Sequence, residues 1–470
     1  MKICAFPEGP CALLLLVALG WTCADRALGI QATIVPTDPP SLAIIVRDAE
    51  GAEVRLAVVP PEIRKAAAEG PVPGPVQPWW DRWELWPAKE QGAGGPPAFS
   101  LSPERDEDGT LILGGLYRAI LPETVRLTDE AGKKTFEMHR DYRYREDWAQ
   151  IANLDGRLGT PGQGRLRAEY RYATQRLDLV ERSADGRLIL KRGMSVMVCP
   201  RLPAPDDGAT PLAGVYVAPW RRDGAFVVTA EDLLAMDPAP PTAPVRPEML
   251  AGAREKLRRG GELKIAFLGD SVTLGAEAGA WWKDLWTEKN KGYASRVVVG
   301  LRRRYPEAVV TPIAAFKGGI TTTKGIELFN EAVGKSGADV LVVAFGLNDA
   351  DGPIGGPPKN PPEAFKGQIR DLIRRARGKS MEVLLVTPCQ PSPFLRNGIA
   401  RRVVEYRRVL LELAEEEGTG VADVYTEWMN QARRGIPPFS QLHNWINHPG
   451  EDGHALYADV ILQFFENDVP

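Results

Sequence analysis

Cysteine and histidine are scarce in this chain, which has five cysteines and four histidines among its 470 residues. Cys4, Cys11 and Cys23 all lie near the N-terminus, so only Cys199 and Cys389 remain, far apart in the sequence. A disulfide framework and a cysteine-rich metal site are therefore excluded. One long-range disulfide stays open, but we expect two buried free thiols and no metal.

The chain also lacks an excess of charge of either sign. Its 58 Lys and Arg residues are balanced by 61 Asp and Glu residues, which gives a formal net charge of −3. A nucleic-acid-binding protein normally carries a basic surface, so we expect no nucleic-acid partner. The composition, 44% hydrophobic and 25% charged, is typical of a globular protein. The length suggests two or three domains.

The N-terminal apolar run is too short for a comfortable membrane span. It covers Cys11–Leu19 and follows Lys2, whereas a spanning helix needs about 20 apolar residues. Small residues come next, a pattern typical of a signal peptide. We therefore predict a signal peptide over residues 1–24, cleaved before Asp25. The mature protein is then secreted or periplasmic, without a stable membrane span; an uncleaved membrane anchor and a lipid anchor on Cys23 are the alternatives.

Residues 25–237 are predicted to form an all-β, sandwich-like accessory domain, with a barrel as the alternative. Short strand-forming segments alternate with turn signals, and few segments of helical length interrupt them. Asp185-Gly186, for example, is a strong hairpin signal between Leu177–Glu181 and Leu188–Lys191. The other predicted strands are Ser41–Arg47, Val54–Val59, Thr124–Thr128, Thr135–His139, Ser195–Cys199 and Val215–Val217.

Four tryptophans, Trp79, Trp80, Trp83 and Trp86, gather in one short segment of this β region. Exposed aromatic rings can stack on sugars, which would make the segment a carbohydrate contact. We favour the other interpretation, in which the rings pack beneath a long loop, because aromatic side chains bury large apolar areas.

A proline-rich linker and a short helix, residues 238–260, separate this region from the rest of the chain. Over residues 261–470, apolar strand-like runs alternate with helical segments, which indicates a mostly parallel sheet with helices on both faces. The predicted strands are Leu263–Leu268, Ala308–Ala314, Val340–Phe345, Glu382–Pro388 and Val421–Val424. The predicted helices are Tyr293–Arg304, Thr322–Val333, Glu363–Ala376, Ile399–Glu417 and Ala455–Phe464.

Parallel strands bring the segments that follow them to one rim, where ligands bind. Ser271, Gly319 and Asn348 follow the first three of these strands, and His448 precedes the last helix. Acyl transfer needs a nucleophile, a base for its proton, and donors for the developing oxyanion. Ser271 and His448 fit the first two roles. The N–H groups of Ser271 and Gly319 and the side chain of Asn348 fit the third.

Two carboxylates of the rim, Asp270 and Asp349, are better suited to orienting the loops by hydrogen bonds. Together, the segments Gly269–Val272, Lys317–Thr322, Gly346–Asp349 and His448–His454 resemble those of the SGNH (GDSL-like) hydrolase/esterase superfamily, over about residues 260–470.

That resemblance implies a three-layer α/β/α, flavodoxin-like domain and no metal or organic cofactor. It also implies Ser271 as nucleophile, Gly319 and Asn348 as oxyanion donors, and His448 as base. The Gly-x-Ser-x-Gly elbow of α/β-hydrolases is absent, because Thr273 stands where its second glycine would be.

The chain departs from the family at one place. The family's acid lies three residues before the histidine, and Trp445 occupies that position here. This acid normally holds the imidazole in the correct tautomer. The backbone carbonyl of Trp445, or a carboxylate from Asp452 or Asp423, could replace it. We expect a Ser–His dyad, since nothing adjacent to His448 supplies the carboxylate.

These features predict an exported serine esterase that acts on a small-molecule or polysaccharide ester, with O-acetyl groups on carbohydrate as the favoured substrate. A lipid esterase or thioesterase would share every catalytic residue. A sugar O-acetyltransferase and a catalytically silent carbohydrate-binding protein are the remaining alternatives.

Overall fold

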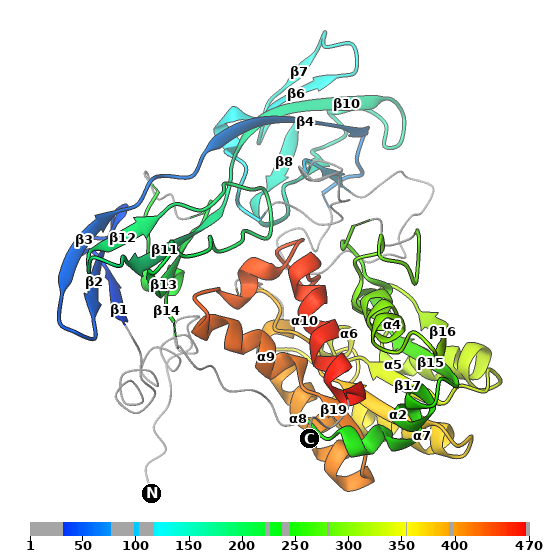
Figure 1. Cartoon of the computed structure of the whole chain (residues 1–470). Helices are drawn as coiled ribbons and strands as arrows, with labels where there is room; N and C mark the ends of the chain where they lie inside the picture. Colours follow the sequence, from blue (N-terminus) through cyan, green and yellow to red (C-terminus); the bar gives the residue numbers. More distant parts are fainter. Residues whose placement is uncertain are drawn as a thin grey trace, which may run out of the picture.

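The computed structural model describes residues 32–76, 98–102, 117–220, 226–236, 245–279, 283–353, 355–393 and 398–466 (Figure 1). The predicted signal peptide (1–24) and the tryptophan-rich segment 79–86 lie outside the described residues, so both stay predictions.

The N-terminal part of the chain, which we call the β region (residues 32–236), consists of antiparallel sheets. One sheet joins β1 (Ala32–Pro36), β2 (Ala43–Asp48) and β3 (Glu53–Ala57). A second has the order β4 (Ile63–Pro71), β10 (Arg165–Ala173), β6 (Arg126–Asp129) and β7 (Thr135–Phe136). The third is β12 (Leu188–Lys191), β11 (Arg176–Arg182), β13 (Thr210–Val217) and β14 (Leu233–Ala235). The fourth is β5 (Phe99–Ser100), β9 (Gln150–Asn153) and β8 (Tyr142–Arg145).

The all-β prediction for this region is therefore confirmed. The three predicted hairpins form as β2–β3, β6–β7 and β11–β12. The predicted strand Ser195–Cys199 is wrong, because only Val196 pairs there, in an isolated bridge with Gln175. Cys199 lies in a left-handed backbone conformation (φ 48°), which a strand does not allow.

The C-terminal part, residues 245–466, is built on one five-stranded parallel sheet. Its strands are β15 (Glu262–Gly269), β16 (Val309–Phe316), β17 (Val340–Ala344), β18 (Glu382–Val386) and β19 (Gly420–Ala422). They lie in the order β16-β15-β17-β18-β19, which is the flavodoxin-like order 2-1-3-4-5. The predicted fold class of this domain is confirmed.

Helices form a layer on each face of this sheet. α4 (Tyr293–Arg304) packs against α10 (Glu451–Leu462), while α7 (Pro362–Arg377) packs against both α5 (Thr322–Leu328) and α8 (Ile399–Glu417). The strand order explains how the helices are divided between the two faces. The step from β15 to β16 runs opposite to the later steps, and right-handed crossovers then place its helix on the opposite face.

Short elements surround this frame. They are α2 (Ala251–Arg258), α3 (Ser271–Leu274), α6 (Leu347–Ala350) and α9 (Val424–Asn430), with 3₁₀ turns at Pro247–Leu250, Gln431–Arg433, Pro438–Gln441 and Gln463–Phe465. α5 continues as a π-helical turn, Phe329–Val333. The sequence placed Val424 in a strand, but Asp423 caps α9 by accepting the N–H of Thr426, so the helix begins there.

The carboxyl ends of four strands lie level. Gly269 at the end of β15 is in register with Phe316 of β16 and Ala344 of β17, and Ala344 is in register with Val386 of β18. The segments that follow these residues therefore meet at one rim.

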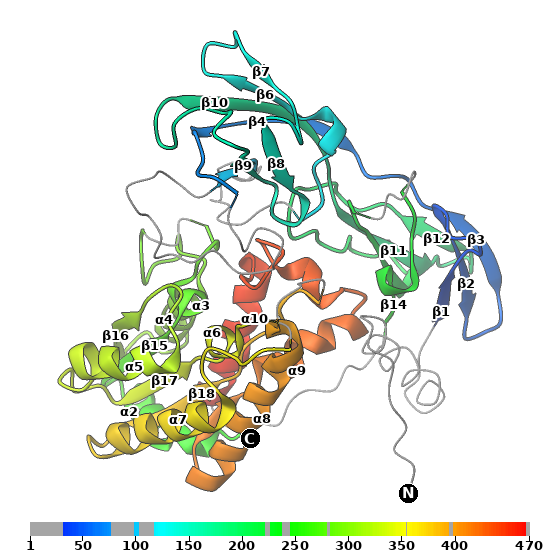
Figure 2. The same ribbon diagram turned by 180° about the vertical axis from the view of Figure 1, so that it is seen from behind.

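The β region packs against the segment 431–450, which joins α9 to α10 (Figure 2). Tyr216 and Trp220 of the β region contact Phe439 and Trp445 of this segment through their rings. The two parts of the chain thus share an apolar core at this boundary.

Cys199 and Cys389 form no disulfide among the described residues; Cys389 is buried and Cys199 partly buried. Across the described ranges, no helix combines the length and apolar character that crossing a bilayer requires. The same ranges hold no group of three or more His, Cys, Asp or Glu side chains arranged for a metal ion.

Gly269 is the last residue of β15, and the chain there has no room for a side chain. A Cβ there would lie 1.9 Å from Thr273 Oγ1 and 2.7 Å from the carbonyl oxygen of Ala344. We predict that Gly269→Ala lowers stability by about 1–3 kcal/mol, the usual cost of overpacking. Thermal unfolding measures this.

Gly367→Ala on α7 is the control, because a Cβ there meets nothing within 4 Å. It should raise stability by up to about 1 kcal/mol through helix propensity. Equal melting temperatures for the two variants would contradict the prediction.

Candidate active site

Ser271 stands at the first position of α3, directly after β15. Asp270 caps this helix, since its side chain accepts the N–H of Val272 at 2.9 Å. The N–H groups of a helix's first turn have no acceptor within the helix, so that of Ser271 is available to a ligand. α3 ends after one turn at Gly275, whose φ of 82° only glycine adopts readily.

His448 lies across the rim from Ser271. Its Nε2 is 2.8 Å from Ser271 Oγ, a hydrogen-bond distance. The histidine is held by its own loop, where Asn444 Oδ1 accepts the N–H groups of Ile446, Asn447 and His448 at 3.0 Å each. Its carbonyl oxygen accepts the N–H of His443 at 2.8 Å. The loop therefore fixes the backbone of His448.

The other ring nitrogen of His448 contacts Glu277. The distance from Nδ1 to Glu277 Oε1 is 2.9 Å, and the Glu277 side chain is fully buried. Glu277 has a φ of 70°, a conformation that costs a non-glycine residue about 1–2 kcal/mol. Strain of this kind persists where surrounding structure enforces it, often at functional sites. Ser271, His448 and Glu277 thus form one chain of hydrogen bonds.

This arrangement corrects the expected Ser–His dyad. None of the three groups considered from the sequence lies at His448 Nδ1. Asp423 accepts from Arg407 Nη2 at 2.6 Å and caps α9. Asp452 pairs with Arg201 at the surface, with distances of 2.8 and 3.0 Å. The backbone carbonyl of Trp445 does not take the role either, because the group at His448 Nδ1 is the Glu277 carboxylate.

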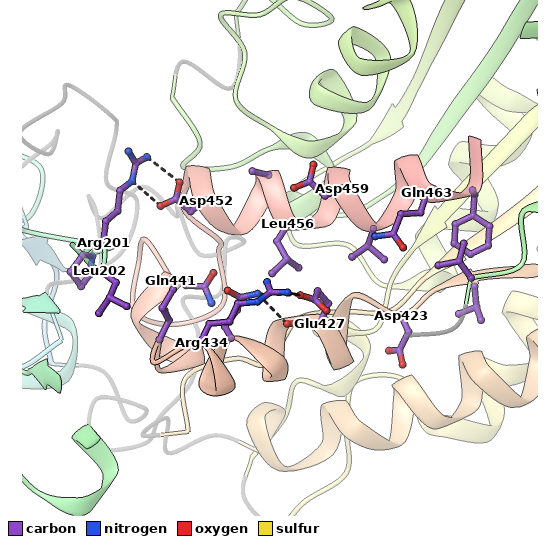
Figure 3. A pocket seen from close by; sticks show the side chains of 18 residues that line it. Arg201, Leu202, Asp423, Glu427, Arg434, Gln441, Asp452, Leu456, Asp459 and Gln463 are labelled. Atoms are coloured by element: carbon purple, nitrogen blue, oxygen red, sulfur yellow. Dashed lines mark hydrogen bonds and ion pairs between the residues drawn. The ribbon is translucent and has the colours of Figure 1, made fainter. Parts of the chain in front are cut away.

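Figure 3 shows where the two aspartates lie. Both line a groove of about 500 Å³ that runs along α10 and α9, and neither Ser271 nor His448 lines it. Two ion pairs join charged side chains of this groove, Glu427 with Arg434 at 2.8 Å and Asp452 with Arg201 at 2.8 Å. This groove is therefore separate from the serine.

Two opposing effects set the proton affinity of His448. Burial is the larger single influence and by itself would lower its pKa. The charge and hydrogen bond of Glu277, with a further contribution from Asp270, together outweigh burial and raise the pKa of His448 above its usual 6.5.

The expected oxyanion donors lie at the same rim. A Cβ placed on Gly318 would be 3.9 Å from Ser271 Cβ, so the glycine pair borders the serine. Gly319 has a φ of 73°, and a Cβ there would meet nothing within 4 Å, which leaves its backbone open to a ligand. Asn348 is nearly buried, and its Nδ2 donates to Ile320 O at 3.1 Å and Asp270 Oδ2 at 3.3 Å.

The two carboxylates expected to orient the rim do make hydrogen bonds to its loops. Asp349 Oδ1 accepts the N–H of Thr322 at 3.0 Å and Asn360 Nδ2 at 2.7 Å, which ties the glycine loop to α6. Burial raises the pKa of Asp349. Burial also raises the pKa of Asp270 to about 7, although the N–H of Val272 and the charge of His448 oppose it.

Glu277 is the residue that sequence reasoning missed. The family's spacing points to residues before the histidine, whereas Glu277 comes six positions after the serine. The available signal was Gly275, which ends the helix and turns the chain back. Ala276 N–H then donates to Ser271 O at 3.0 Å, and this turn carries Glu277 under the imidazole.

A serine hydroxyl bonded to an imidazole, which a buried carboxylate orients in turn, is the arrangement that activates serine as a nucleophile. Residues 267–456 match the model of the GDSL-like lipase/acylhydrolase family. An acetylxylan esterase from Geobacillus stearothermophilus is 22% identical over 204 residues, which cover 43% of this chain and 92% of that protein.

Solved structures match the same part of the chain. The acetylxylan esterase from Geobacillus stearothermophilus is 21% identical, with 44% of this chain and 95% of that chain covered and a TM-score of 0.37. An α/β hydrolase enzyme from the metagenome of Lake Arreo, Spain, is 20% identical over 44% of this chain and 97% of its own, with the same TM-score of 0.37. A lipase/acylhydrolase from Enterococcus faecalis is 22% identical over 43% and 94%, with a TM-score of 0.33.

We predict that Glu277→Gln lowers the pKa of His448. The amide keeps the shape and removes the negative charge, so the influence of burial prevails. A proton NMR titration measures this, because the chain has only four histidines and a His448→Gln variant assigns the resonance. Asp452→Asn is the matched control, since it removes a carboxylate four residues from His448 that pairs with Arg201 instead. An unchanged His448 titration in Glu277→Gln, or an equal shift in the control, would refute the assignment.

Proposed function

We propose that the C-terminal domain of this protein is an ester hydrolase in which Ser271 attacks the ester to form an acyl-enzyme; the match of residues 267–456 to the GDSL-like lipase/acylhydrolase family supports this. The observation that carries this proposal is the continuous hydrogen-bond chain from Ser271 Oγ through the imidazole of His448 to Glu277. The three side chains take the roles of nucleophile, base and orienting acid.

In the first half-reaction, His448 Nε2 accepts the proton of Ser271 Oγ while the oxygen attacks the ester carbonyl carbon. Negative charge develops on the carbonyl oxygen, where the N–H groups of Ser271 and Gly319 and the amide of Asn348 stabilise it. The bond to the alcohol oxygen then breaks, and the departing alcohol takes the proton from His448. The acyl group remains on Ser271.

In the second half-reaction, water replaces the alcohol. His448 accepts a proton from the water as its oxygen attacks the acyl carbon, and the bond to Ser271 Oγ breaks with return of the proton to the serine. The products are a carboxylic acid and the free enzyme. Glu277 stabilises the imidazolium of each step and holds the tautomer with Nε2 facing the serine.

We propose O-acetyl groups on carbohydrate as the substrate. The acetylxylan esterase relative supports this class, although its identity is only 22%. The predicted signal peptide supports it as well, because a secreted or periplasmic enzyme meets polysaccharides. As part of the same proposal, residues 25–237 form an accessory domain, and residues 238–260 link it to the hydrolase domain. The alternative of a catalytically silent carbohydrate-binding protein depended on a missing acid. Glu277 lies at His448 Nδ1, so that argument for it no longer applies.

We predict that the purified protein hydrolyses p-nitrophenyl acetate and that Ser271→Ala abolishes this activity. Asn348→Ala should lower kcat by about 10²–10³-fold, the usual cost of one oxyanion donor. Steady-state kinetics measure both effects. Ser183→Ala in the β11–β12 hairpin is the control and should keep wild-type rates. Full activity in Ser271→Ala would show that another residue is the nucleophile.

The acyl group and the acceptor define the substrate class. We expect kcat/KM on p-nitrophenyl esters to fall from acetyl to octanoyl, and acetylated xylan to release acetate. A rise with chain length would instead identify a lipid esterase. Transfer of the acetyl group to an added sugar, in place of acetate release, would identify a transferase.

A further inference from the structure

The segment that carries His448 has little regular structure of its own. Between α9 and α10 it contains only two short 3₁₀ turns, Gln431–Arg433 and Pro438–Gln441, and one bridge between Leu442 and Pro449. The hydrogen bonds of Asn444 fix its tip locally. What fixes the segment as a whole is therefore found outside it.

Aromatic contacts with the β region provide one such restraint. The rings of Trp445 and Trp220 lie 5.0 Å apart at 66°, in an edge-to-face arrangement. Trp220 is braced in turn by Tyr117 and Tyr216, at 5.5 and 5.6 Å. Trp445 is buried and has a φ of 62°, so its backbone conformation is unfavourable without this packing. It stands three residues before His448.

Close backbone approaches add a second restraint. A Cβ on Gly214 of β13 would lie 1.7 Å from the carbonyl oxygen of Gly435, so these two backbones touch. Next to them, Met236 and Arg434 form an antiparallel bridge. These two contacts restrain the start of the segment 431–450 against the β region.

A third restraint lies just after the histidine. A Cβ on Gly450 would be 2.4 Å from Cys199 Sγ and 3.3 Å from Cys199 Cβ. The Arg201–Asp452 ion pair nearby is exposed, with side-chain accessibilities of 68% and 50%, and contributes little. The packing of Gly450 against Cys199, and not the exposed ion pair, therefore restrains the chain after His448.

We propose that the β region is part of the catalytic unit, with Trp220 acting as a positioning residue that sets His448 against Ser271 through Trp445. This rests on the proposed esterase function. The β region thus restrains the segment both before and after the histidine, so its packing contributes to the geometry of the Ser271–His448–Glu277 chain. A displacement of about 1 Å in such a chain can cost roughly 10²-fold in rate.

The test compares Trp220→Ala and Trp220→Phe in the full-length protein. We expect Trp220→Ala to lower kcat at least tenfold with little change in KM, and Trp220→Phe to recover most of the loss. The NMR pKa of His448 should fall in Trp220→Ala, because contact with Glu277 weakens. Ile44→Ala is the matched control, since Ile44 is fully buried in a cluster formed only by residues of the β region. It should destabilise that region while kcat and the His448 pKa stay at wild-type values.

A second pair of variants keeps the proposal testable if Trp220→Ala does not fold. Gly450→Ala should lower kcat, because its methyl group meets Cys199 Sγ, and the double variant Cys199→Ala/Gly450→Ala should recover it. Wild-type kcat and an unchanged His448 pKa in folded Trp220→Ala, or an equal loss in Ile44→Ala, would overturn the proposal. An inactive wild-type protein would instead overturn the esterase function, while the His448 titrations would still report the positioning.

Discussion

The contact between Glu277 and His448 is the interaction on which the rest of the site depends. A carboxylate with no exposed surface needs a partner, because burying an uncompensated charge is costly. Glu277 Oε1 finds that partner in the imidazole, whereas Oε2 has none among the described residues. Removing one member of a buried pair typically costs about 3–5 kcal/mol. The histidine segment is thus tied to the turn after Ser271 by stability as well as by chemistry.

Around this pair, the parallel sheet provides a fixed frame. The level ends of β15, β16 and β17 bring Ser271, the glycine loop and α6 to one rim. Asp270 and Asp349 then join these segments to one another through buried hydrogen bonds. His448 is different, because it reaches the rim from a loop before the final helix. Its position depends on contacts from outside the sheet, and the β region supplies part of them through Trp220 and Cys199.

The C-terminal sheet and most of its helices could be predicted from sequence because their apolar patterns are local. Ser271, Gly319, Asn348 and His448 could be placed for a similar reason, since each follows a strand or precedes a helix. Glu277 could not, because its place depends on a turn with positive φ at a glutamate, which no periodicity marks. The boundary at Asp423 was missed because the helix cap follows the last residue of β19, Ala422, with no turn residue between them.

The β region shows the same division between local and distant information. Hairpins such as β11–β12 follow from a turn signal between neighbouring strands. The pairing of β4 with β10 joins residues about a hundred positions apart, and the intervening chain gives no indication of it. The contact of Trp220 with Trp445 spans an even longer separation, so the dependence of the histidine on the β region became visible only in three dimensions.

The ring cluster at Tyr117, Tyr216 and Trp220 also bears on the order in which the chain is assembled. Ribosomal synthesis delivers these residues more than two hundred positions before Phe439 and Trp445, the rings that cover them. Until the C-terminal segment emerges, the nascent β region presents an uncovered aromatic face, the type of surface that binds chaperones or aggregates. Contacts between residues so distant in sequence form slowly. Completion of the histidine loop and burial of this face therefore depend on the same contacts.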